Sequence, residues 1–195
     1  MKKTMFIAVF ALVFGLILIG NVSGQAGSGK SAAYVKIFES GTYYMKSSIT
    51  NEGMTMVMET YAKSGKMAVI TTSQGMTNRA VHKDGKSYMI MDSMQMVMVM
   101  PLTDAAKAGT IKTDSMKFAS SGTAVFNGKT LPYDEYSNAE GLKIRYFVDG
   151  SKLAGVRTIT KEGTFDIVIT ELNQNVPDKV FDIPSGYQIQ EIPKL

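Results

Sequence analysis

Methionine is the residue type with the most unusual placement in this chain. The sequence has 15 methionines, and all except Met1 and Met5 lie between Met45 and Met116. The methionine side chain is flexible and its sulfur is polarizable, so methionine-rich surfaces suit apolar ligands of varied shape. Thioether sulfur is also a ligand for Cu(I). Two chemistries are therefore open at this segment, the binding of an apolar ligand and the binding of a soft metal ion.

Turn residues predict how these methionines are arranged. Glu52-Gly53, Ser64-Gly65, Gln74-Gly75, Asp84-Gly85 and Asp92-Ser93 are typical of two-residue hairpin loops. Such loops fix the cross-strand partners, so one face can be followed from strand to strand. Twelve methionines fall on one face, here called the Met face: Met45, Met54, Met56, Met58, Met67, Met76, Met89, Met91, Met94, Met96, Met98 and Met100. The opposite face is predicted to face water because it carries Lys46, Glu59, Lys63, Lys66, Arg79, Lys83, Lys86 and Gln95.

Three interpretations of the Met face remain open. As an adaptable surface it would bind or carry a lipid or a lipoprotein acyl chain, without catalysis, through Met45, Met54, Met56, Met58, Met67, Met89, Met91, Met94, Met96, Met98 and Met100. As a closed core it would belong to a structural or interaction module. As a metal site it would make the protein a periplasmic Cu(I)-binding protein, with the ligands His82, Met67, Met76 and Met89.

Catalytic groups and conventional metal ligands are scarce. The sequence has no cysteine, which excludes disulfides, thiolate metal sites and cysteine nucleophiles. A single histidine, His82, argues against most zinc sites and Ser-His-Asp triads. Asp134 and Glu135 are adjacent carboxylates, but strand neighbours point to opposite faces, and both are expected to be solvated or turn residues. The sequence therefore predicts a protein that is not an enzyme and has no cofactor.

The N-terminal segment has the pattern of a secretory signal peptide. Lys2 and Lys3 precede an apolar run from Met5 to Gly20, and Val22 and Gly24 are small residues placed as at a cleavage site. We predict a signal peptide over 1–24, a flexible linker over 25–32 and one domain over 33–195. The protein is then exported, and is soluble in the periplasm or outside the cell. The formal net charge is +4 and 19% of the residues are charged, which does not indicate a nucleic-acid-binding surface.

A phosphate-binding pattern overlaps this linker. Gly24 to Ser31 reads GQAGSGKS and matches G-x4-G-K-[ST], a loop that cradles nucleotide phosphates in other proteins. That function needs a buried strand before the loop and a βαβ unit after it, whereas here a signal peptide precedes it and hairpins follow. The sequence therefore predicts a Gly/Ser linker and no nucleotide partner.

The remaining chain has the rhythm of an antiparallel sheet. Turn signals recur every 8–13 residues or so, at Asn127-Gly128, Asn138 to Gly141, Asp149-Gly150 and Glu162-Gly163 as well as at the five earlier pairs. Lys30 to Glu39 predicts a short amphipathic helix with Ala33, Tyr34, Ile37 and Phe38 on one side. Pro101 to Lys117 predicts a helical insertion. The expected fold is α+β, with about five strands on each side of the insertion and the short helices packed on the Met face.

Two segments resemble the lipoprotein-carrier superfamily, whose members are LolA-like. Asp84 to Pro101 (DGKSYMIMDSMQMVMVMP) is similar to its D-G-K hairpin, and Val176 to Tyr187 (VPDKVFDIPSGY) is similar to its closing P-x-x-F-x-x-P-x-G-Y segment. The resemblance implies a curved antiparallel sheet, an unclosed β-barrel, with short helices covering the concave face. It also implies that the concave side holds acyl chains or other apolar ligands, with a lipoprotein or another envelope protein as partner. The resemblance implies that the chain is a small, uncharacterised secreted relative of this superfamily, of the kind classed as a domain of unknown function.

Overall fold

The computed structural model describes residues 29–51, 53–101 and 116–192. The predicted signal peptide, the first part of the predicted linker and nearly all of the predicted helical insertion lie outside the described residues. Within them the elements are α2 (Ala32–Glu39), β1 (Tyr43–Asn51), β2 (Met54–Lys63), β3 (Lys66–Ser73), β4 (Met76–Lys83), β5 (Lys86–Met91), η1 (Asp92–Met94), β6 (Met96–Pro101), β7 (Lys117–Phe126), β8 (Lys129–Ser137), β9 (Lys143–Asp149), β10 (Lys152–Ile159), β11 (Thr164–Asn173), η2 (Asp178–Phe181) and β12 (Gln188–Glu191).

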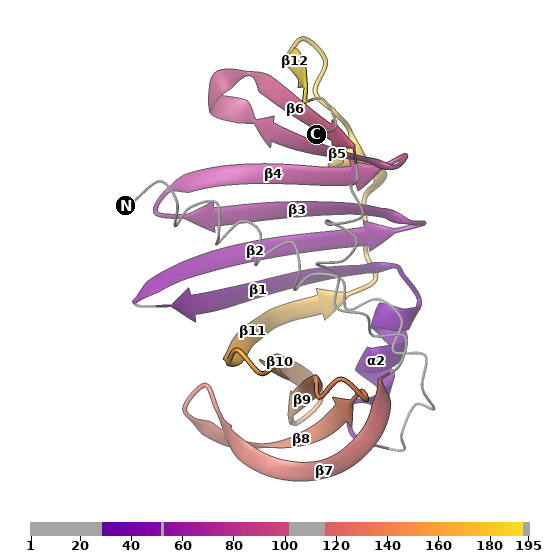
Figure 1. Cartoon of the computed structure of the whole chain (residues 1–195), viewed down its shortest axis with the longest axis vertical. Coiled ribbons are helices and arrows are strands. Elements are labelled where there is room, and N and C mark those ends of the chain that lie inside the picture. The colour runs from indigo at the N-terminus through magenta and orange to yellow at the C-terminus, as the bar shows by residue number, and fades with distance from the viewer. Residues whose placement is uncertain (1–28, 52, 102–115, 193–195) are drawn as a thin grey trace.

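The strands form one large open sheet. Its order is β12-β6-β5-β4-β3-β2-β1-β11-β10-β9-β8-β7, with 12 strands. All neighbours are antiparallel except β12 and β6, which run parallel. Figure 1 shows β1 to β5 side by side in one half and β7 to β11 curled in the other, with α2 beside the curled half. The predicted antiparallel sheet is thus confirmed. Among the described residues one α-helix is present, α2, and the helical insertion predicted over Pro101 to Lys117 lies almost wholly outside them.

Most of the predicted turns are two-residue loops. Ser64-Gly65, Gln74-Gly75, Asp84-Gly85 and Asn127-Gly128 have positive φ at both positions, as type I′ hairpin turns require. The loop after β5 differs from the prediction, because Met91 pairs with Met96 and four residues connect the strands. Its last residue, Gln95, is left-handed at φ 47°. A loop longer by two residues keeps the same side chains on the same face.

The main core lies where α2 packs on the sheet, and this side is called the inner face. Val35 and Phe38 of α2 are buried there against Tyr43, Met45 and Tyr146. The Phe38 ring meets the Tyr43 ring edge-on, with 5.2 Å between centroids. Ala33, expected on the apolar side of the helix, is exposed. The helix is therefore rotated from its predicted orientation, and Val35 takes the buried position.

On the opposite, outer face of β3 to β6 the middle of the sheet is buried, which corrects the prediction of a water-facing surface for that part. Its central residues Ala68, Val81, Ile90 and Val97 have no exposed area. They are covered by residues 176–187, a segment here called the strap, through Val176, Phe181, Ile183 and Tyr187. The strap follows β11 and leads to β12 at the far edge of the sheet (Figure 1). Two of the outer-face lysines bind it, since Lys63 donates to the Val176 carbonyl at 3.5 Å and Lys83 to the Phe181 carbonyl at 3.0 Å.

Asp134 and Glu135 are both buried within β8, although solvated or turn residues were expected. As predicted for strand neighbours, they serve opposite faces. Asp134 is 2% exposed and accepts hydrogen bonds from the Ser31 backbone N–H at 2.7 Å and from the Ser121 hydroxyl at 2.6 Å. Glu135, on the outer face, pairs with Arg145 at 2.7 Å. Ser31, placed in the predicted linker, is therefore fully buried and fixes the start of α2.

Buried tyrosines in the inner core predict alkaline sensitivity. Burial raises the pKa of Tyr43 to about 12 and also raises the pKa of Tyr146. The unfolded chain releases these protons near pH 10, so their stabilising contribution is complete below that pH and is lost as pH rises toward about 12. We expect the urea midpoint to fall steeply between about pH 10 and pH 12. Tyr43→Phe should make the fall shallower, and an unchanged slope in this variant would contradict the assignment.

Candidate functional site

The strand register places the methionines of β1 to β6 on one face. Met58 lies opposite Ser47 and Thr71, Met67 opposite His82, and Met89 opposite Met98. Met45 is also on this face and belongs to the core beneath α2, so the Met face continues the inner face. Met94 departs from the prediction, because it lies in the η1 turn outside both strands and is 68% exposed. Met116, which the prediction left off the face, is fully buried in the inner core.

The methionines of the Met face range from fully buried to half exposed. Met45 and Met58 are buried, at 3% and 1%. The remaining strand methionines of β5 and β6, together with Met56 and Met67, are half-buried. Met54 and Met76, at the start of their strands, are 44% and 53% exposed. The small cluster around Met58 and Val69 is made by β1, β2 and β3 themselves, through Ile49, Met56 and Met67.

The candidate copper ligands are brought together only in part. His82 is directly opposite Met67, and Met89 is its diagonal neighbour on β5, within about 8 Å for such positions. Met76 lies at the other end of β4, about 20 Å from His82 at the usual rise per residue, so it cannot share an ion with His82. Burial lowers the pKa of His82 and favours its neutral form. No group of three or more His, Cys, Asp or Glu side chains in the described part of the chain is placed to hold a metal ion.

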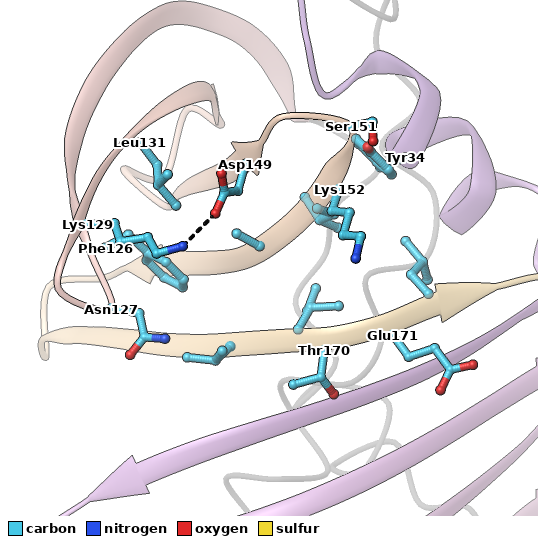
Figure 2. A pocket seen from close by; sticks show the side chains of 15 residues that line it. Tyr34, Phe126, Asn127, Lys129, Leu131, Asp149, Ser151, Lys152, Thr170 and Glu171 are labelled. Atoms are coloured by element: carbon cyan, nitrogen blue, oxygen red, sulfur yellow. Dashed lines mark hydrogen bonds and ion pairs between the residues drawn. The ribbon is translucent and has the colours of Figure 1, made fainter.

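A cavity of about 440 Å³ lies elsewhere, in the curled half of the sheet. Its apolar wall combines Tyr34, Leu153, Ile169 and Leu172 of the inner core with Phe126, Leu131, Ala154 and Val168 of an outer cluster. Its polar lining is Asn127, Lys129, Asp149, Ser151, Lys152, Thr170 and Glu171. Figure 2 shows that the lining side chains come from around the β7–β8 and β9–β10 turns, from β11 and from α2. Residues of both clusters therefore line the cavity.

The cavity lies where the pairing of β10 and β11 ends. Their pairing begins at Ile159–Thr164 and ends at Gly155–Val168. Each strand then carries an irregularity where the ladder stops, β10 between Leu153 and Gly155 and β11 between Ile169 and Glu171. Bulges of this kind bend a strand and are common beside functional sites. We call the opening between residues 152–154 and 169–172 the strand split.

Phe126 lies against Gly155, at the end of the split and on the outer side. A Cβ at Gly155 would collide with the Phe126 ring and with the Ile167 carbonyl oxygen, so glycine is required for this approach. Phe126 stacks on Phe147 at 4.4 Å between centroids, and the Arg157 guanidinium lies 5.3 Å from the Phe147 ring. Arg157 in turn is fixed by two hydrogen bonds of 2.7 Å to Asp166. The sequence analysis did not predict this site. A glycine inside a strand, as at Gly155, is a signal for a β-bulge or for the close approach of another group to the backbone.

The described residues include no helix with the length and apolar character needed to cross a bilayer.

Comparisons with known proteins identify the fold only. No family model matches the chain, and no curated protein matches it. An uncharacterized conserved protein from Thermus thermophilus has a similar structure, with a TM-score of 0.52 and 9% identity over 84% of this chain and 100% of that chain. A structure of PNGF-II has a TM-score of 0.35 and 13% identity over 77% of this chain and 31% of that chain, which is too low to support an argument. The first of these shows that an open sheet of this kind occurs in a Thermus protein.

Proposed function

We propose that the protein binds or carries an apolar ligand, a lipid or a lipoprotein acyl chain, on the Met face and without catalysis. The observation that carries this proposal is the contrast between the two faces of β3 to β6. The outer face is closed by the strap over Val81, Ile90 and Val97. The inner face instead presents half-buried methionines on adjacent strands, with Met89 opposite Met98 and Met91 opposite Met96.

The energetics of such a surface are sufficient for binding. Burial of a CH2 group contributes about 0.8 kcal/mol, so a sixteen-carbon chain gains roughly 13 kcal/mol before entropic losses. Flexible thioether side chains adjust to chains of different length and branching. The same surface needs no polar anchor, which fits the apolar character of the paired methionines on β5 and β6.

We further propose that the protein acts in the cell envelope. The N-terminal pattern of Lys2, Lys3 and the apolar run to Gly20 supports export. The two segments that resemble the lipoprotein-carrier superfamily support a LolA-like carrier role. Nucleotide is an unsuitable partner, because the Asp134 carboxylate already accepts the Ser31 N–H at the start of α2, where a phosphate would have to bind.

Oxidation of the methionines tests this function. Mild peroxide should first convert Met54, Met76 and Met94, then the half-buried methionines of β5 and β6, and should leave Met58 and Met116 intact. Sulfoxide is polar, so uptake of the neutral dye N-phenyl-1-naphthylamine should fall as β5 and β6 become oxidised, with an unchanged far-UV circular dichroism spectrum. Peptide mapping by mass spectrometry reads each site. If β5 and β6 are oxidised only as the protein unfolds, the closed-core module replaces the binding proposal.

Copper is the second candidate, and the cross-strand pair of His82 and Met67 favours it. The peroxide experiment, repeated with Cu(I) present, tests this candidate. Bound Cu(I) should shield Met67 and Met89 from peroxide but not Met76, and His82→Ala should remove the shielding. Equal oxidation with and without Cu(I) excludes the metal site.

A further inference from the structure

We infer that the strand split between β10 and β11 binds an extended peptide segment of about three or four residues. The split is lined by residues 152–154 on one side and 169–172 on the other. It lies in the curled half of the sheet, and none of its 15 lining residues is a methionine. The inference is therefore independent of the apolar-ligand proposal for the Met face.

Backbone groups are the first argument for a peptide. Both edges of the split are in strand conformation, and each pairs on its far side, Leu153 with Val148 and Leu172 with Met45. The described ladder between β10 and β11 ends at Gly155–Val168, so backbone groups of 152–154 and 169–172 that face each other across the split are not paired in it. An added strand supplies donors and acceptors at the same repeat of about 3.3 Å per residue.

The same backbone groups argue against an acyl chain here. A hydrocarbon chain would cover these N–H and C=O groups without bonding to them, and each buried unsatisfied group costs about 1–3 kcal/mol. A peptide satisfies them. The occupant of the split therefore differs in chemistry from the proposed occupant of the Met face.

Side chains indicate the character of the peptide. Phe126, Leu131, Leu153 and Ile169 are buried in the wall and would receive apolar side chains of the ligand. Charges of both signs lie at the rim (Figure 2), where Lys129 and Asp149 pair at 3.0 Å, and Lys152 and Glu171 are exposed. This arrangement favours a segment with an apolar centre and polar or charged flanks over a strongly acidic or basic one.

The test uses the purified chain as bait for a library of random seven-residue peptides, and the tightest binder is synthesised as the probe. We expect a micromolar dissociation constant. Ala154→Phe fills the split and should weaken the probe at least tenfold, whereas Ala33→Phe, at an exposed helix position, should not change it. In the wild-type protein the probe should slow amide hydrogen exchange at residues 152–154 and 169–172.

Three outcomes would overturn the inference. One is that no peptide is enriched on the wild-type chain relative to Ala154→Phe. Another is that the probe slows exchange elsewhere in the sheet. The third is that a neutral detergent such as dodecyl maltoside protects the amides of the split and no peptide does, which would assign the cavity to an acyl chain. If Ala154→Phe does not fold, the exchange measurement on the wild-type protein decides the matter alone.

Discussion

Phe181→Ala is expected to lower the free energy of unfolding by about 3–5 kcal/mol, the usual range for removal of a buried phenylalanine ring. Phe181 is 3% exposed and lies in the cluster that the strap forms with Ala68, Val81 and Ile90 of the sheet. Domains of this size have about 5–15 kcal/mol of stability, so the loss is a large fraction of the total. Urea unfolding followed by far-UV circular dichroism measures it.

Charge contributes much less to the strap. Lys63 and Asp178 form an ion pair of 2.9 Å, but the Asp178 side chain is 80% exposed. Exposed pairs of this kind contribute about 0–1 kcal/mol. Asp178→Ala should therefore have a small effect, and Ile189→Ala, at a residue 62% exposed in β12, should stay within about 0.5 kcal/mol of wild type. A comparable loss for Phe181→Ala and Ile189→Ala would show that the strap does not seal the outer face.

The register of β1 to β6 could be predicted because local turn chemistry determines it. Positions such as Asp84-Gly85 adopt positive φ readily, and each two-residue turn fixes the partners of the strands on both sides. The turn after β5 was predicted wrongly, but it is longer by an even number of residues, so the side chains of β6 still lie on the predicted face. Following the partners from strand to strand is therefore sufficient to place Met67 opposite His82, and Met89 on the same face as Met98.

Long-range contacts could not be predicted in the same way. The strap, which covers β3 to β6, lies about a hundred residues further along the chain. On the outer face charged and apolar residues are mixed, as in Lys66 beside Ala68 and Arg79 beside Val81, and this mixture is equally compatible with a solvent-exposed face. The burial of Asp134 depends on Ser31, which is 103 residues away. The strand split lies at irregularities in two strands and next to Phe126, a residue from the tip of a third hairpin.

The two segments that carry the family resemblance are in contact. Tyr88, Ile90, Val97 and Val99 of the β5–β6 hairpin share a cluster with Val176, Phe181 and Tyr187 of the strap. The Tyr187 hydroxyl donates to Asp92 at 3.0 Å, and the Gln188 N–H donates to the Gln95 carbonyl at 2.9 Å. The strap therefore packs on the outer side of the β5–β6 hairpin, whose inner side presents Met89, Met91, Met96 and Met98. Phe181→Ala should for this reason loosen the proposed binding surface as well as lower the free energy of unfolding.

Replacement of Met89 and Met98 by lysine is expected to weaken binding of N-phenyl-1-naphthylamine more than tenfold. The two residues are directly opposite on β5 and β6 and are half-buried in the middle of the hairpin part of the Met face. An apolar ligand laid across them would have to remove two ammonium groups from water, and buried unpaired charges cost several kcal/mol each. The dye is uncharged, so the lysines offer it no compensating ion pair. Fluorescence titration measures the dissociation constant.

The matched control is Thr72→Lys with Thr77→Lys. These threonines are also directly opposite, with 3.2 Å between their hydroxyl oxygens, but they are exposed on the outer face of β3 and β4. The control adds the same two charges and the same cross-strand repulsion, which amounts to about 1 kcal/mol or less. Dye affinity should stay within twofold of wild type in the control and fall only in the Met-face variant. Equal affinity in both variants would mean that the dye binds elsewhere, and the proposal that the Met face is the ligand surface would then be abandoned.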